Sequence, residues 1–174
     1  VGDTVTVTFT GEETLISQTA SIVTQSATIT DLGGQVYTAK YKMTVSDPEG
    51  EVAFEIIVTD RVEIDSDPVT QTNDGTAVIF DRTAPTLSPV HIESDNANNT
   101  LIAIGGDNIY LTFTPDEEPL VLDSIVVTIA GLATTLTESD GSYTATLTLT
   151  GSEPDGILEF TIDFKDRAGN PGIQ

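Results

Sequence analysis

The chain has 174 residues, 28 of them acidic and only six basic, so its formal net charge is −22. This charge argues against binding to nucleic acid or to anionic lipid surfaces, and it favours solubility and divalent cations. Cysteine is absent and His91 is the only histidine, which removes disulfides, thiolate metal sites, the usual zinc sites and most Ser-His-Asp chemistry.

Nothing in the chain predicts membrane insertion, because no apolar run approaches the roughly 18 residues that a spanning helix needs. The start of the sequence has no signal-peptide pattern. We therefore expect a soluble chain that is either mature or internal to a longer one.

The first predicted strand is Thr4–Thr10, in which Val5, Val7 and Phe9 alternate with threonines. A similar stretch, Asn108–Thr114, places Ile109, Leu111 and Phe113 on one face. Between and after them, the sequence predicts further short strands within Ile22–Thr30, Tyr37–Val45, Val52–Val58, Thr76–Asp81, Leu87–Glu93, Ile125–Thr137, Tyr143–Thr150 and Leu158–Phe164. No segment has a helical period over ten residues, which predicts an all-β protein.

One stretch occurs twice, at Tyr37–Asp60 and at Tyr143–Asp166, with a constant offset of 143 − 37 = 106 and identity at ten of 24 positions. Each copy has an alternating strand, a Pro-acidic-Gly turn and a second alternating strand. This pattern is typical of a β-hairpin or of a crossing between the two sheets of a sandwich. A period this long indicates tandem copies of one domain rather than solenoid repeats of about 20–50 residues.

The repeat predicts two domains, residues 1–85 and 86–174, separated by the segment Asp81–Pro85. The first copy has no counterpart of Pro85–Gly105, its expected first strand. The second has no counterpart of roughly Ile64–Pro85, its expected last strand. We expect either a window from a longer array or edge strands that neighbouring chains supply.

Seven short strands per repeat, with turns between them, predict two tandem immunoglobulin-like β-sandwich domains. We expect two separate cores that bury Val7, Phe9, Phe54 and Ile56 in the first and Leu111, Phe113, Phe160 and Ile162 in the second.

Four segments carry a resemblance to a known family: Gly2–Thr10, Tyr37–Gly50, Phe80–Pro85 and Asp166–Asn170. They resemble the bacterial immunoglobulin-like tandem repeats of large cell-surface adhesins. The resemblance implies a secreted or cell-surface protein, neighbouring repeats as partners and calcium between domains. The first copy departs from it, because Asp60-Arg-Val-Glu-Ile64 replaces the DRAGN of Asp166–Asn170.

Strand direction in a seven-strand sandwich predicts that acidic loops of the two domains meet at their junction. The expected calcium ligands are Asp47, Glu49, Asp81, Asp116, Glu117, Asp166 and Asn170. Crowded carboxylates repel by about 1 kcal/mol per close pair even in water, and a cation with six to eight oxygen ligands relieves that repulsion. The alternative for Asp166–Asn170 is a plain hairpin turn in which Gly169 supplies a positive φ.

The function that we expect from the sequence is a non-enzymatic spacer in an extracellular surface protein or fibre. The alternatives are a glycan- or protein-binding module and a subunit of a strand-exchanged filament. Paired acids such as Glu117 and Glu118 could serve a glycosidase, but Glu12 and Glu13 occupy the matching loop of the first copy, as a feature of the repeat would.

Overall fold

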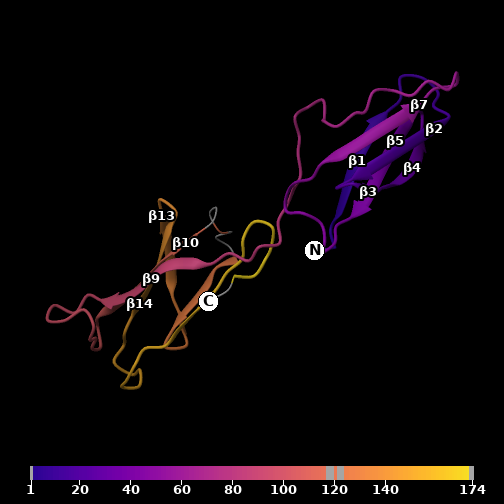
Figure 1. The fold of residues 1–174 in the computed structure, drawn as a ribbon. Helices are drawn as coiled ribbons and strands as arrows, with labels where there is room; N and C mark the ends of the chain where they lie inside the picture. The colour runs from indigo at the N-terminus through magenta and orange to yellow at the C-terminus, as the bar shows by residue number, and fades with distance from the viewer. Residues whose placement is uncertain (1, 117–119, 121–123, 173–174) are drawn as a thin grey trace. The chain divides into compact units, whose positions relative to one another are not determined.

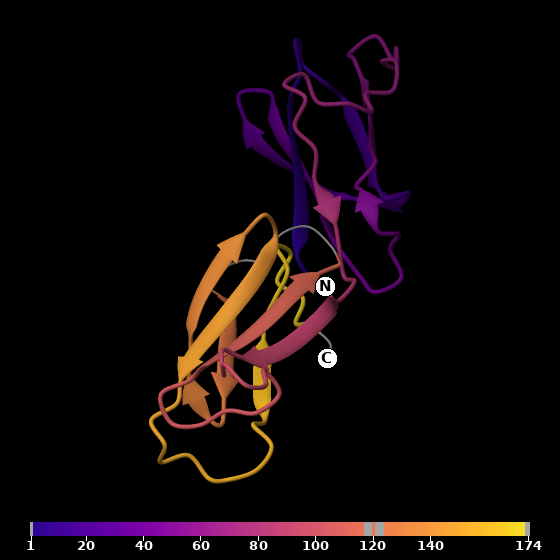
Figure 2. The ribbon, with the colours of Figure 1, turned by 90° about the vertical axis from the view of Figure 1, so that its left-hand side faces the viewer.

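The computed structural model describes residues 2–116, 120 and 124–172. Every strand pair in this part of the chain is antiparallel and no helix occurs in it, which confirms the all-β prediction (Figures 1 and 2). The chain divides into two compact units, Val1–Arg82 (unit 1) and Thr83–Gln174 (unit 2).

Unit 1 contains three small sheets. They have the strand orders β1-β5-β4, β3-β2-β7 and β6-β8. The strands are β1 (Thr4–Thr10), β2 (Ser17–Ile22), β3 (Gln25–Ser26), β4 (Thr28–Gly33), β5 (Val36–Lys42), β6 (Gly50–Glu51), β7 (Phe54–Thr59) and β8 (Ile79–Phe80). The predicted last strand, Thr76–Asp81, is too long, because only Ile79 and Phe80 pair with Glu51 and Gly50 of β6.

Unit 2 contains a four-stranded sheet, β13-β14-β10-β9, and a three-stranded sheet, β12-β11-β15. The strands are β9 (Leu87–Ser94), β10 (Asn108–Pro115), β11 (Val126–Ile129), β12 (Leu132–Ala133), β13 (Thr135–Ser139), β14 (Ser142–Thr148) and β15 (Phe160–Asp163). Figure 2 shows β9 and β10 side by side in this unit.

The repeated stretch is a crossing between sheets and not a hairpin. In unit 1 it runs from β5 in one sheet to β7 in another, and in unit 2 it runs from β14 to β15 in the same way. The strand registers repeat too, since Phe9 lies opposite Tyr37 and Phe113 lies opposite Tyr143. Both aromatic pairs stack with ring centroids 5.4 Å apart.

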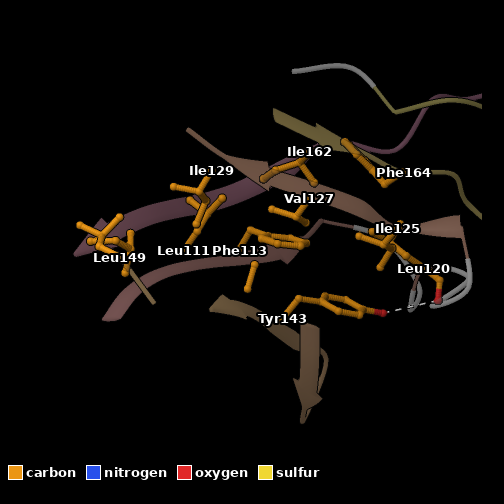
Figure 3. Packing of buried hydrophobic residues seen from close by; sticks show 12 residues of the cluster. Leu111, Phe113, Leu120, Ile125, Val127, Ile129, Tyr143, Leu149, Ile162 and Phe164 are labelled. Atoms are coloured by element: carbon orange, nitrogen blue, oxygen red, sulfur yellow. Dashed lines mark hydrogen bonds between the residues drawn. The ribbon is translucent and has the colours of Figure 1, made fainter. Parts of the chain in front are cut away.

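Each unit has its own cluster of buried apolar side chains. The cluster of unit 2 contains Leu111, Phe113 and Ile162, as the alternation predicts (Figure 3). Tyr143 also lies in this cluster, and its hydroxyl donates to the carbonyl oxygen of Leu120 at 3.4 Å.

Four of the eight predicted core residues are only half-buried, which corrects the expectation of full burial. Val7 and Phe9 are half-buried on β1, whereas Leu111 and Phe113 are buried at the matching positions of β10. The reason is the number of neighbouring strands. β10 lies between β14 and β9, but within the described residues β1 pairs with β5 alone.

The other two half-buried residues are Phe54 and Phe160, the first residues of β7 and β15. Further along these two strands, Ile56 and Ile162 are buried as predicted. Alternation therefore identifies the inward face of each strand correctly, and burial on that face depends on how far the residue lies from the strand's end or the sheet's edge.

The segment between β9 and β10 brings two glycines into backbone contact in unit 2. A Cβ atom on Gly105 would lie 2.8 Å from the Cα atom of Gly151, closer than real side chains allow. The residue of unit 1 that matches Gly151 at the 106-residue offset is Val45, whose side chain is exposed.

Candidate functional site

Asp47 caps a turn that follows β5 in unit 1. Its Oδ2 atom accepts hydrogen bonds from the Thr44 amide at 2.6 Å and from the Thr44 hydroxyl at 3.0 Å. Its Oδ1 atom accepts one from the Tyr41 hydroxyl at 3.2 Å, and only 5% of the residue is exposed. These donors, the Thr44 amide above all, hold the pKa of Asp47 below its ordinary value.

Glu153 makes the same turn in unit 2, 106 residues later. It accepts the Thr150 hydroxyl at 2.8 Å, the Thr150 amide at 3.1 Å and the Gly151 amide at 2.9 Å. The backbone amides, with that of Thr150 first, lower the pKa of Glu153 to about 2. The two turns share the pattern Thr-x-Ser-acid-Pro, so one side chain closes the same loop in both units.

The depressed pKa predicts how acid affects unit 2. A carboxylate that the folded state stabilises contributes to stability above its unfolded pKa, and this contribution is lost as the pH falls through the folded pKa. We expect the stability difference between the parent chain and Glu153→Gln to be full above about pH 4.5 and to close toward about pH 2. Thermal unfolding at pH values across this window measures it.

The matched control is Asp155→Asn, which removes the same charge from an exposed side chain two residues away. A gap between Glu153→Gln and the parent that stays constant down to pH 2 would contradict the prediction, because the loss would then not depend on the ionised carboxylate.

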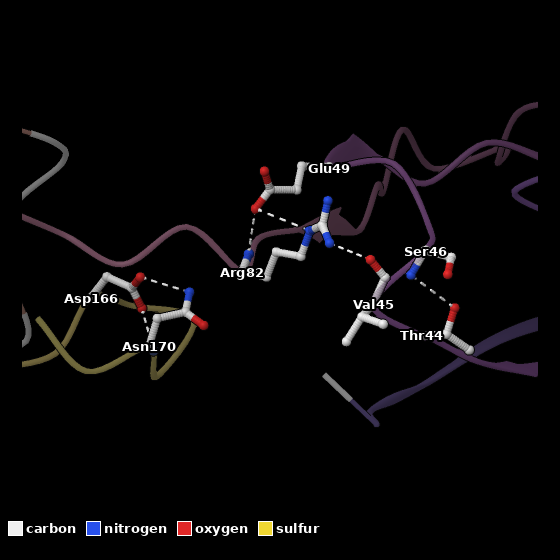
Figure 4. A network of polar contacts seen from close by, with 7 residues as sticks. All are labelled: Thr44, Val45, Ser46, Glu49, Arg82, Asp166 and Asn170. Atoms are coloured by element: carbon white, nitrogen blue, oxygen red, sulfur yellow. Dashed lines mark hydrogen bonds and ion pairs between the residues drawn. The ribbon is translucent and has the colours of Figure 1, made fainter.

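A second acidic turn also recurs in both units. Asp166 accepts the Asn170 amide and the Asn170 side-chain amide, both at 2.8 Å (Figure 4). Asp60 accepts the amides of Val62 at 2.8 Å and Ile64 at 2.9 Å. The turn therefore forms in unit 1 although its sequence departs from DRAGN.

The backbone of this turn needs a positive φ at its fourth residue. Gly169 has a φ of 89° in unit 2, and Glu63 has a φ of 63° at the same position of unit 1. A glutamate in this conformation is unfavourable, which indicates that the hydrogen bonds accepted by the Asp60 carboxylate help to set the shape of the turn.

Glu49 and Asp116 also accept backbone hydrogen bonds. The Arg82 amide donates to Glu49 at 2.8 Å, and the Arg82 guanidinium lies 3.8 Å from the same carboxylate and donates to the Val45 carbonyl (Figure 4). Asp116 accepts the Thr86 amide at 2.9 Å as well as the Thr86 hydroxyl, and these donors, the hydroxyl first, lower its pKa.

Of the predicted calcium ligands, Glu117 lies outside the described residues and Asp81 is partly exposed beside Arg82 in the chain. The structure places Asp47 and Glu49 on one loop, and it joins Asp166 to Asn170. Among the residues that the structure describes, no group of three or more His, Asp or Glu side chains is arranged to hold a metal ion. The four other described acids among the predicted ligands all accept hydrogen bonds, Asp47 and Asp166 within turns and Glu49 and Asp116 from residues distant in sequence.

Sequence reasoning overlooked other acids with the same role. Asp95 accepts the amide and side chain of Asn108, both at 2.8 Å, and Asp107 accepts the Asn96 side chain at 2.8 Å and the Ile104 amide at 2.9 Å. Glu153 and Asp60 were also missed. The signal that identifies Glu153 is its alignment with Asp47 after a threonine three residues earlier.

His91 lies exposed on β9, with its Nε2 atom 3.5 Å from a carboxylate oxygen of Glu93.

The described residues contain no helix with the length and hydrophobicity of a membrane span. No protein-family model matches this sequence, and a search of the curated proteins found no similar sequence.

Proposed function

We propose that the chain supplies two immunoglobulin-like modules of a non-enzymatic spacer in an extracellular bacterial adhesin or fibre. The observation that carries this proposal is the repetition of the acidic turns. Asp47 and Glu153, and likewise Asp60 and Asp166, hold the same backbone loops in the two units. Acids that shape a repeated fold in this way support a mechanical role more than a catalytic one.

Calcium at the junction of the modules is the second part of the proposal. A net charge of −22 concentrates carboxylates on a small chain, and an oxygen-seeking cation reduces their repulsion. Each hydrogen-bonded carboxylate keeps further lone pairs that such an ion can use. Calcium would then limit bending between modules and set the reach of the spacer.

Small-angle scattering and thermal unfolding of the full chain, in calcium and in chelator, test both parts. We expect two separated modules in calcium and a wider range of separations in chelator. Calcium that binds only the folded form stabilises it by about 2.7 kcal/mol at a hundredfold excess over Kd. Asp81→Ala should reduce this response, and Asp67→Ala, which changes an exposed acid elsewhere in unit 1, should not.

The spacer and the calcium site can be rejected independently of each other. Identical scattering and melting with and without chelator would reject calcium and leave the spacer. A single compact particle under both conditions would reject the spacer, because fused modules cannot set a reach.

A further inference from the structure

Unit 2 contains an open groove beside the loop that follows β14. Its volume is about 710 Å³, and its walls include Ala103, Ile109, Leu149 and Leu158. Leu149 marks one end of the buried cluster in Figure 3. Two large apolar side chains are exposed at its rim, Leu101 at 82% and Ile157 at 95%. An exposed apolar patch of this kind often marks a binding surface.

In unit 1 the matching place is filled by β8. Phe80 lies opposite Gly50 and Ile79 lies opposite Glu51, and the Val52 amide donates to the Val78 carbonyl at 2.9 Å. The Phe80 side chain is 6% exposed and packs in one cluster with Met43 and Val52. This strand therefore closes the core of unit 1 with a single aromatic side chain.

The repeat carries the floor of this site into unit 2, and none of the described strands covers it there. At the 106-residue offset Met43 corresponds to Leu149, Val52 to Leu158, and Gly50-Glu51 to Gly156-Ile157. Within the described residues, no strand pairs with Gly156-Ile157. Accordingly Leu158 is only half-buried, whereas Val52 is 8% exposed beneath β8.

We propose that the groove of unit 2 binds an extended segment of the β8 type, with the pattern Val-Ile-Phe-Asp-Arg. The segment pairs antiparallel with Gly156-Ile157 and places a phenylalanine against Leu149 and Leu158. This is recognition by strand addition, in which backbone hydrogen bonds give affinity and a side-chain pocket gives specificity.

Charge supports the same occupant. In unit 1 the residue two positions after Phe80 is Arg82, whose guanidinium lies 3.8 Å from the carboxylate of Glu49. The counterpart of Glu49 in unit 2 is Asp155, which is exposed at the end of the groove. A segment with the pattern Val-Ile-Phe-Asp-Arg thus finds an apolar pocket and an acidic partner at the spacing that unit 1 uses.

This inference goes beyond the proposed function and does not depend on it, because it rests on the internal repeat and the groove of unit 2. A chain that fails the scattering test for a spacer can still bind the segment, and a chain that passes it can fail to bind. The two results therefore separate the proposals.

The test uses the full chain and a fluorescent peptide with the sequence of Thr76–Arg82. We expect saturable binding, with NMR shift changes at the amides of Gly156, Ile157 and Leu158. The peptide with Phe80→Ala should bind about tenfold more weakly or worse, as the loss of an aromatic anchor predicts. Because this change is made in the peptide, it leaves the folding of the protein untouched.

The control variant is Ile157→Glu, which gives unit 2 the residue that unit 1 has at Glu51. Strand addition should survive it, because Glu51 pairs with Ile79 while its own side chain stays exposed. Binding that is lost in Ile157→Glu would overturn the proposal in favour of non-specific apolar contact. Absence of saturable binding, equal affinity for the Phe80→Ala peptide, or shift changes confined to β1 would overturn it as well.

Discussion

Replacing Phe113 by alanine is expected to lower the free energy of unfolding of unit 2 by about 3–5 kcal/mol. The ring is 1% exposed in the centre of the unit's apolar cluster. It lies on β10 between two neighbouring strands and stacks on Tyr143, so a cavity left there has few ways to collapse. Denaturant unfolding followed by NMR signals of each unit measures the loss.

Phe9→Ala is the matched control in unit 1. Phe9 stacks on Tyr37 at the same centroid distance, 5.4 Å, but it is half-buried on the edge strand β1. Because part of its apolar surface already faces water in the folded chain, we expect a smaller cost of roughly 1–2 kcal/mol. Equal losses in the two variants would show that the edge position does not matter, against the account given for these strands.

Replacing Gly105 by alanine is expected to destabilise unit 2 by about 1–3 kcal/mol, the range typical of overpacking. The added methyl group would lie 2.8 Å from the Cα atom of Gly151, and backbone cannot move aside as the end of a side chain can. The same shift should weaken peptide binding in the groove, since Gly105 and Gly151 both line it.

Ile104→Ala provides the control for Gly105, because it removes an exposed side chain from the neighbouring position. Surface changes of this kind typically stay within about 0.5 kcal/mol. Thermal unfolding of both variants compares them, and a Gly105→Ala chain as stable as Ile104→Ala would show that the loop relaxes without cost.

Alternating apolar residues were sufficient to predict most of the strands, although β2 (Ser17–Ile22) was missed. Val5, Val7 and Phe9 give the face of β1, and Ile109, Leu111 and Phe113 give that of β10. Alternation did not predict that Phe9 is half-buried and Phe113 buried. That difference depends on β9, which pairs with β10 in unit 2, whereas among the described residues only β5 pairs with β1.

The acidic residues show a different limit of sequence reasoning. Asp47, Asp116 and Asp166 were selected for their charge, whereas the structure uses each as an acceptor for amides a few or many residues away. Charge alone does not distinguish a turn-capping carboxylate from a metal ligand. The structure adds the donors that each carboxylate meets, and for Asp116 the donor is Thr86, 30 residues earlier in the chain. The calcium junction stays a prediction.

Glu63, at the positive-φ position of the Asp60 turn in unit 1, has a practical consequence for finding diverged copies of this module. A search that requires the glycine of DRAGN would overlook unit 1, where Glu63 occupies the position of that glycine and also has a positive φ. Both units instead keep Thr-x-Ser-acid-Pro-acid-Gly followed by an aspartate ten positions after the glycine, from Gly50 to Asp60 and from Gly156 to Asp166. A sequence profile can be built on the threonine and the acids whose side chains hydrogen-bond to the loops, rather than on the glycine at the positive-φ position. Such a profile should find copies of this module that ordinary sequence similarity misses.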